Sequence, residues 1–251
     1  VTNMDGIEWK RSKFSNKVKM FLKYAEKLAV NHSDYFISDS IGIQKYLQEK
    51  FAVESTYIPY GTEKMVHPNL DVLNTYNLSK YNYDIVIARM EPENNIEIIL
   101  EGFMHSKKER DLVIIGSLKT DFGKYISKKY DDKQIKYLGF VLGIDNLNSL
   151  RYYSNLYFHG HSVGGTNPSL LEAMASNSLI CAHDNIFNQS ILDNNAYYFT
   201  DFKHVSDLLN NKVKDLNSQI IQNNQNNINK LYSWSKIVDD YDSFFHKIIS
   251  K

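Results

Sequence analysis

Short apolar runs alternate with longer amphipathic stretches along residues 83–199. Apolar runs of about 4–8 residues are typical of buried strands, and apolar residues three or four positions apart are typical of helices. The pattern predicts strands at Tyr83 to Ala88, Asp111 to Ile115, Ile135 to Leu138, Asn155 to Phe158, Leu179 to Ala182 and Ala196 to Phe199. It predicts helices between them near Asn95 to Met104, Lys119 to Lys129, Asp145 to Tyr153, Pro168 to Ser176 and Phe187 to Leu192. This alternation predicts an α/β fold on a parallel sheet.

The first part of the chain repeats the alternation on a smaller scale. Strands are expected at Val1 to Met4, Tyr35 to Ser38 and Ser55 to Ile58, with helices at Ser15 to Val30 and Ile41 to Phe51. So few strands make a thin sheet, and we expect part of this unit to lie upstream. Turn-rich residues 61–81 form the expected linker, and further helices are expected at 205–211, 215–231 and 234–249, the last capped by Ser233.

The most informative segment runs from His159 to Ala175 and carries three glycines between an expected strand and an expected helix. Asn167 is a good N-cap, and Pro168 suits the first helical position, where an N–H would have no partner. We expect the amides from Ser169 onward to lack carbonyl partners and to form a phosphate site with the helix dipole. The glycines would leave room for the ligand. For a glycine-rich loop alone, an ordinary strand-to-helix turn is the favoured interpretation. The cap, the proline and Glu172 together favour a ligand site.

This segment resembles the donor-site signature of GT-B glycosyltransferases of family four. The residues that carry the resemblance are Gly160-His161-Ser162-Val163-Gly164-Gly165-Thr166-Asn167-Pro168-Ser169-Leu170-Leu171-Glu172-Ala173-Met174. The segment is most similar to a branch that includes rhamnosyltransferases of bacterial cell-wall and capsular polysaccharide assembly. The resemblance implies that Glu172 holds the ribose hydroxyls of a nucleotide sugar. It implies that the diphosphate is held by the loop residues Gly164, Gly165, Thr166, Asn167, Pro168, Ser169 and Leu170. Gly164 stands where most members carry a glutamate.

The same resemblance implies a GT-B-like fold of two Rossmann-like parallel-sheet domains. Residues 1–61 would be a partial N-terminal acceptor domain that lacks its front half, and residues 62–232 the C-terminal donor domain. The last helix, in residues 233–251, would pack back on the first domain.

Two further positions of the expected donor domain follow predicted strands. Arg89 comes after the strand that begins at Tyr83, and an arginine there could hold a diphosphate through its guanidinium fork. The family has a lysine five residues later, where this chain has Asn94. Gly116 ends the next strand and is expected to add a backbone contact. A solvated loop residue is the alternative interpretation of Arg89.

Three residues are candidates for catalysis. Asp5 falls where related enzymes carry a histidine near the donor sugar, and its carboxylate could accept the acceptor's proton or stabilise positive charge at the sugar. The alternative is an aspartate that holds a tight turn before Gly6. Glu8 is the second candidate, and His161 is expected to reach the donor sugar. His159 is expected to be structural, and the absence of a cluster of Cys or carboxylate residues near these histidines argues against a metal site.

Composition adds three constraints. The formal net charge is zero, which gives no reason to expect nucleic acid as a partner. The single cysteine, Cys181, excludes an intrachain disulfide and fits a reducing, cytoplasmic compartment. Residues 10–27 carry Lys10, Arg11, Lys13, Lys17, Lys19, Lys23 and Lys27 against one acid, Glu26. A basic amphipathic helix is typical of peripheral contact with the inner face of a membrane, and a solvated helix face is the alternative.

The resemblance implies a retaining glycosyltransferase that needs no cofactor or metal ion. The expected donor is dTDP-L-rhamnose, and the expected acceptor is a polyprenyl-diphosphate-linked sugar or a saccharide of a surface polysaccharide. The alternative is a fragment or inactive relative that binds a nucleotide sugar without transferring it. An epimerase on the same fold would need a paired acid and base across the cleft, and the sequence offers no such pair.

Overall fold

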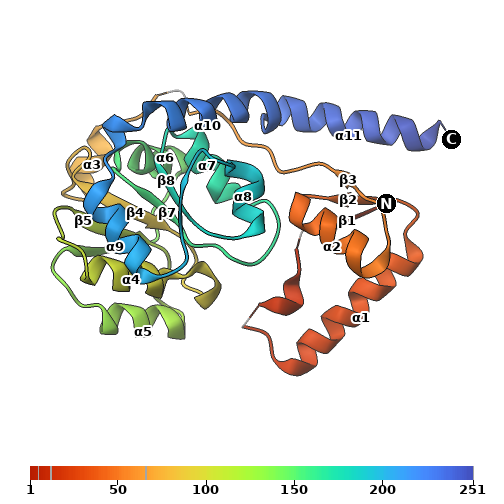
Figure 1. Cartoon of the computed structure of the whole chain (residues 1–251), viewed down its shortest axis with the longest axis horizontal. Helices are drawn as coiled ribbons and strands as arrows, with labels where there is room; N and C mark the ends of the chain where they lie inside the picture. Colours follow the sequence, from red (N-terminus) through yellow and green to blue (C-terminus); the bar gives the residue numbers. More distant parts are fainter. Residues whose placement is uncertain (5, 12, 66, 251) are drawn as a thin grey trace.

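Two parallel sheets organise the chain (Figure 1). The computed structural model describes residues 1–4, 6–11, 13–65 and 67–250. The larger sheet has the order β6-β5-β4-β7-β8-β9, and all its pairs are parallel. Its strands are β4 (Tyr83–Ile87), β5 (Asp111–Ile115), β6 (Ile135–Gly139), β7 (Tyr157–His159), β8 (Ile180–His183) and β9 (Tyr197–Phe199). The chain moves outward from β4 to β6 and then returns to β7, so the strand order reverses between β4 and β7. The predicted α/β fold with parallel sheets is confirmed.

Both faces of this sheet are apolar, which explains why its strands appear as nearly continuous apolar runs. Tyr83 and Ile85 point into one buried cluster, and Val86 points into the other. The helices of this larger unit are α3 (Asp71–Thr75), α4 (Ile96–Met104), α5 (Asp121–Lys129), α6 (Ile144–Tyr153), α7 (Pro168–Ala175), α8 (Ile186–Leu192), α9 (Phe202–Asn211) and α10 (Ser218–Leu231). Short 3-10 helices are η2 (Pro92–Asn94) and η3 (Lys214–Leu216).

The smaller sheet has the order β1-β2-β3 and is also parallel. Its strands are β1 (Thr2–Met4), β2 (Phe36–Ser38) and β3 (Thr56–Tyr57), and its helices are α1 (Asn16–His32), α2 (Ile41–Phe51) and the 3-10 helix η1 (Glu8–Lys10). The final helix, α11 (Trp234–Ile249), begins after the Ser233 cap. Ile237 and Phe244 of α11 are buried against Ile37 and Ile58 of the small unit.

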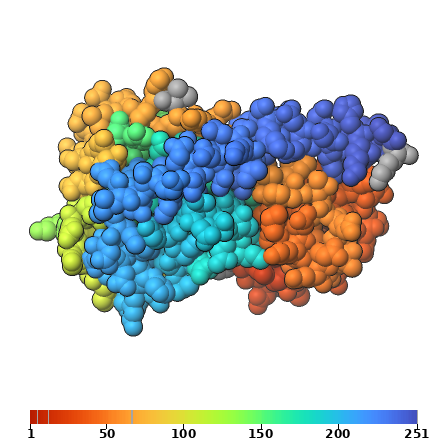
Figure 2. Space-filling model, turned by 45° about the horizontal axis from the view of Figure 1, so that its top comes forward, coloured from red at the N-terminus to blue at the C-terminus, as the bar shows by residue number. Residues whose placement is uncertain are grey.

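The chain passes between the two units twice, and their surfaces also touch. Thr62 N donates to the carbonyl of Tyr232 at 2.8 Å where both passages meet. Phe187 of α8 packs so closely on Gly42 of α2 that a Cβ on this glycine would lie 2.5 Å from the ring. Figure 2 shows this turquoise segment against the orange small unit, with α10 and α11 in blue along both. Among the described residues, no helix is both long and apolar enough to cross a membrane.

Candidate functional site

A cleft of about 720 Å³ lies at the carboxyl ends of β4, β5 and β7, where the strand order reverses. Open α/β sheets bind ligands at this kind of switch point. The predicted residues that line it are Arg89, Asn94, Gly116, His161, Gly164, Gly165, Thr166, Asn167, Pro168, Ser169 and Glu172. Leu170 is instead fully buried in the core beneath the loop. Glu8 does not line the cleft, and Asp5 lies outside the described residues.

The glycine-rich loop uses its amides differently from the prediction. Asn167 caps α7 as expected, but its Oδ1 accepts the N–H of Ser169 at 2.9 Å, and its carbonyl accepts the N–H of Leu170 at 3.0 Å. The expectation that amides from Ser169 onward lack partners is therefore wrong, because the cap satisfies them. Within the loop, the hydrogen bonds found among the described residues include none donated by the N–H groups of Gly164, Gly165 and Asn167.

The two loop glycines are required for different reasons. Gly164 has φ +124°, a conformation that other residues rarely adopt. A Cβ on Gly165 would lie 2.0 Å from both carboxylate oxygens of Asp39, a residue of the small unit. The Asp39 Oδ2 accepts the N–H of Thr166 at 2.9 Å. Gly165 thus lines the cleft and also makes room for a protein carboxylate.

Glu172 is held by a buried arginine that the sequence analysis did not single out. Arg151 of α6 is 1% exposed, and its Nη2 donates to Glu172 Oε2 at 2.6 Å and to Ser169 Oγ at 3.0 Å. Its Nη1 donates to Asn148 Oδ1 at 2.8 Å, while its buried Nε has no partner among the described residues. Helix spacing offered a signal, because Arg151 lies four positions after Leu147, on the face that packs toward the sheet. The arginine fixes the carboxylate of Glu172 at the cleft wall.

Two histidines, one at the end of β7 and one two residues beyond it, face the cleft in the neutral form. Burial, helped by the charges of Arg11 and Arg89, lowers the pKa of His161 to about 4. Its Nδ1 lies 2.9 Å from Asn94 Oδ1, and Asn94 Nδ2 donates to the Arg89 carbonyl at 2.7 Å. This orientation of the amide places the hydrogen of His161 on Nδ1 and leaves Nε2 as an acceptor. Asn94 therefore has both ends of its side-chain amide engaged within the protein.

His159 is more deeply buried than His161. It is 4% exposed, burial lowers its pKa well below the usual value, and its Nε2 has no partner among the described residues.

Cations from both units face the cleft. The Arg89 side chain is 61% exposed, with its Nε 3.8 Å from Glu91. Arg11 of the small unit also lines the cleft, is 16% exposed and pairs with Glu8 at 2.7 Å. Arg11 was counted only as part of the basic run, because nothing in the local sequence indicates that it faces the other unit. Glu8 is thus the ion-pair partner of a residue in the cleft wall.

Comparison with known proteins identifies the fold. A family profile described as a domain of unknown function, DUF1972, matches residues 1–63. A search of curated proteins found no match.

Several solved structures superpose on nearly the whole chain. Sucrose-phosphate synthase from Thermosynechococcus elongatus has a TM-score of 0.79 at 14% identity, over 97% of this chain and 65% of its own. Anabaena HepE in complex with UDP-glucose has a TM-score of 0.80 at 14% identity, over 98% and 71%. The S. aureus protein TarM has a TM-score of 0.73 at 17% identity, over 97% and 49%. The chain therefore has a GT-B-like fold and spans 49% to 71% of the length of these structures.

Proposed function

We propose that this chain binds a nucleoside diphosphate sugar in the cleft and takes part in glycosyl transfer. The observation that carries the proposal is the convergence of three kinds of group at the switch point. These are the backbone of the glycine loop, the guanidinium of Arg89, and the carboxylate of Glu172, which accepts a hydrogen bond from Arg151. They suit the diphosphate and the ribose of one ligand. The structure of HepE was solved in complex with UDP-glucose, which supports this ligand class.

The proposed chemistry places stabilising groups where negative charge develops. As the bond from the sugar to the diphosphate breaks, N–H groups and guanidinium groups stabilise the leaving diphosphate. Glu172 accepts hydrogen bonds from the ribose hydroxyls, and the neutral His161 offers Nε2 to a sugar hydroxyl. No metal ion or cofactor is part of the proposal. Asp5 remains the candidate for a carboxylate at the reacting sugar, whereas Glu8 lies outside the cleft lining and pairs with Arg11.

The finer assignment rests on the sequence resemblance. We propose retention at the anomeric carbon, dTDP-L-rhamnose as donor, and a lipid-linked or saccharide acceptor in surface polysaccharide assembly. A cytoplasmic location follows from the same proposal, because nucleotide sugars would have to reach the cleft.

Calorimetry with UDP, dTDP, UDP-glucose and dTDP-L-rhamnose tests the binding site. Glu172→Gln should weaken binding of all four, because an amide oxygen is a poorer acceptor for the two ribose hydroxyls of the uridine ligands and for the single deoxyribose hydroxyl of the thymidine ligands. Arg89→Ala should cost about 1.5–3 kcal/mol with diphosphates, the range for a hydrogen bond to a charged group, and much less with UMP or dTMP. Equal losses for monophosphate and diphosphate would show that Arg89 does not contact the diphosphate.

A second candidate function is binding without transfer. It is favoured by the limited length of the chain relative to the structures that it matches. Release of labelled sugar from the best-bound nucleotide sugar, with and without a lipid-linked acceptor, separates the two functions. Tight binding with no release in either case would establish the binding module.

We also propose that α1 contacts an anionic membrane surface. Met20 and Phe21 are each 66% exposed and Tyr24 is 58% exposed, and lysines surround them along the helix. Replacing Lys17, Lys23 and Lys27 with Gln should reduce sedimentation with phosphatidylglycerol vesicles, most strongly at low salt. The matched control replaces Lys124, Lys128 and Lys133 of the large unit with Gln. Equal loss in both triple variants, or no vesicle binding by the unmodified chain, would exclude α1 as a membrane contact.

A further inference from the structure

Asp39 is a buried carboxylate of the small unit that reaches the glycine loop of the large unit. It directly follows β2, is 2% exposed and lines the cleft. Its Oδ2 accepts the N–H of Thr166 at 2.9 Å, and its backbone carbonyl accepts the hydroxyl of Thr166. These residues lie 127 positions apart in the sequence, so their contact joins the two walls of the cleft.

The loop is shaped to receive this carboxylate. Any side chain at Gly165 would strike it, since a Cβ there would lie 2.0 Å from Oδ1 and from Oδ2. The neighbouring Gly164 would bring a Cβ within 3.4 Å of His161 Nε2. Asp39 and His161 thus flank Gly164 and Gly165, two residues that line the cleft.

Charge decides which part of a ligand this carboxylate can face. A diphosphate is negative, so a carboxylate beside it is repelled, whereas a hydroxyl group is a good donor to it. In the proposed function the ribose has its own acceptor in Glu172, which is held by Arg151. The remaining hydroxyl-bearing part of a nucleotide sugar is the sugar itself.

We propose that Asp39 accepts a hydrogen bond from a hydroxyl group of the donor sugar and so contributes to the choice of sugar. The inference rests on the proposed function, and it adds a recognition residue from the other unit. Because one Asp39 oxygen is fixed by Thr166, the carboxylate is oriented before the ligand arrives, which favours selectivity between sugars that differ in hydroxyl position.

The test compares each nucleotide sugar with its own diphosphate. Asp39→Asn keeps the shape, and its amide oxygen can still accept the N–H of Thr166, but it replaces one acceptor with a donor. Calorimetry should show a loss of about 10- to 100-fold for UDP-glucose or dTDP-L-rhamnose, as for the loss of a charged hydrogen bond. Affinity for UDP and dTDP should not fall. Thr166→Val is the matched control, because it removes the hydroxyl contact to the Asp39 backbone and leaves the carboxylate in place.

The possible outcomes separate this inference from the proposed function. Equal losses for a nucleotide sugar and its diphosphate, or no loss for either sugar, would overturn the role of Asp39 alone. A loss in Thr166→Val that matches the loss in Asp39→Asn would assign the effect to the contact between the cleft walls and would also overturn it. An unmodified chain that binds none of the four nucleotides would overturn the proposed function itself. Denaturant unfolding of both variants checks that each is folded.

Discussion

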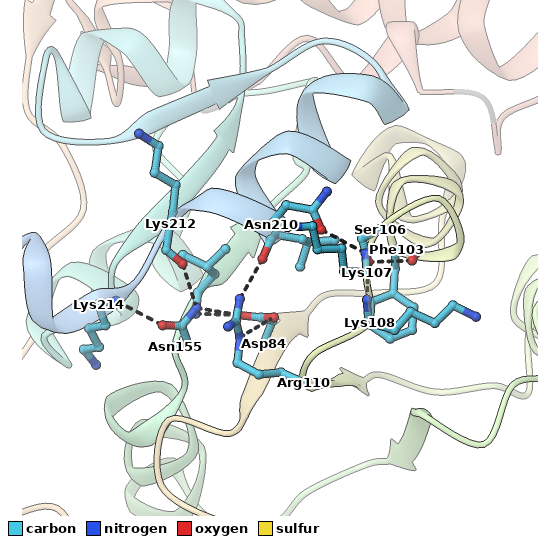
Figure 3. Close-up of polar contacts among 12 residues, drawn as sticks. Asp84, Phe103, Ser106, Lys107, Lys108, Arg110, Asn155, Asn210, Lys212 and Lys214 are labelled. Atoms are coloured by element: carbon cyan, nitrogen blue, oxygen red, sulfur yellow. Dashed lines mark hydrogen bonds and ion pairs between the residues drawn. The ribbon is translucent and has the colours of Figure 1, made fainter.

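The two ends of the six-stranded sheet differ in how far the hydrogen bonds of their buried polar groups are satisfied. At the amino end, Asp84 of β4 is 1% exposed and accepts three hydrogen bonds. Their donors are Arg110 Nε at 3.2 Å, Asn155 Nδ2 at 3.0 Å and the N–H of Leu156 at 3.0 Å. The Asn155 Oδ1 accepts the N–H of Lys214 at 3.0 Å (Figure 3). This network ties the segment after α9 to the sheet.

At the carboxyl end, several buried groups keep unused hydrogen-bonding capacity. The Nε of Arg151 and the Nε2 of His159 are both buried and have no partner among the described residues. A buried polar group without a partner costs about 1–3 kcal/mol, so such groups are retained mainly where something else supplies the partner. The amino end therefore stabilises the fold, whereas the unsatisfied groups at the carboxyl end fit the ligand site of the proposed function.

The largest expected effect comes from breaking the amino-end network. Asp84→Ala leaves the Arg110 guanidinium buried without its carboxylate and should destabilise the protein by about 3–5 kcal/mol, as when one partner of a buried ion pair is removed. Denaturant unfolding measures this loss. Nucleotide affinity of the folded variant should be unchanged, because the cleft lies at the other end of the strands.

Asp111→Ala is the control for this prediction. Asp111 also begins a strand at the amino end, but its ion pair with Lys136 is partly exposed, with 25% of the aspartate side chain accessible. Its removal should cost less than about 1 kcal/mol. Similar losses for the two variants would contradict the distinction between a buried hub and an ordinary surface pair.

Sequence patterns predicted the sheet well because parallel strands buried on both faces leave a strong local signal. The expected strands at 83–88 and 111–115 agree with β4 and β5 to within one residue. The short helix α3 was missed inside the expected linker, since five residues are too few for a helical period to appear. The Asn167 cap and the following proline were read correctly, because caps are local chemistry.

The site was harder to predict wherever two distant segments meet. No local pattern links Asp39 to Thr166. The sequence therefore did not indicate that Gly165 makes room for the Asp39 carboxylate, and Gly165 was assigned to ligand access alone. Arg11 was likewise assigned to a surface run although it lines the cleft. Sequence located the loop and its helix, whereas the contacts between the two units required the fold.

One arginine variant at each end of the sheet tests whether the two ends contribute differently to nucleotide affinity and to stability. Arg151→Met removes the donors that orient Glu172 and should weaken UDP and dTDP binding by about 1.5–3 kcal/mol. Its stability should fall less than that of Asp84→Ala, because the Glu172 side chain is 29% exposed and water can replace the arginine. Arg110→Met at the amino end should do the reverse, with a large loss of stability and unchanged affinity. Calorimetry measures the nucleotide affinity of each variant, and denaturant unfolding measures its stability. If both variants lost affinity and stability to the same extent, the two ends of the sheet would not differ in function.

The smallest expected effect is a difference in pH dependence. The pKa of His161 falls from 6.5 in the unfolded chain to about 4 in the folded protein, chiefly through burial. The unfolded state therefore binds the extra proton as the pH drops below 6.5, and the stabilising contribution of the neutral histidine, complete above that pH, is lost on acidification. Asp84 should act in the opposite direction, because burial raises its pKa and the folded state gains protons first. His161→Asn removes only the carboxyl-end contribution, so the stability lost between about pH 6.5 and 5.5 should shrink by about 1 kcal/mol relative to the unmodified chain. Unfolding curves at both pH values measure the difference. Equal losses of unfolding free energy in the variant and the unmodified chain would mean that His161 is already protonated in the folded state. The carboxyl end would then accommodate a charged side chain as readily as the amino end does.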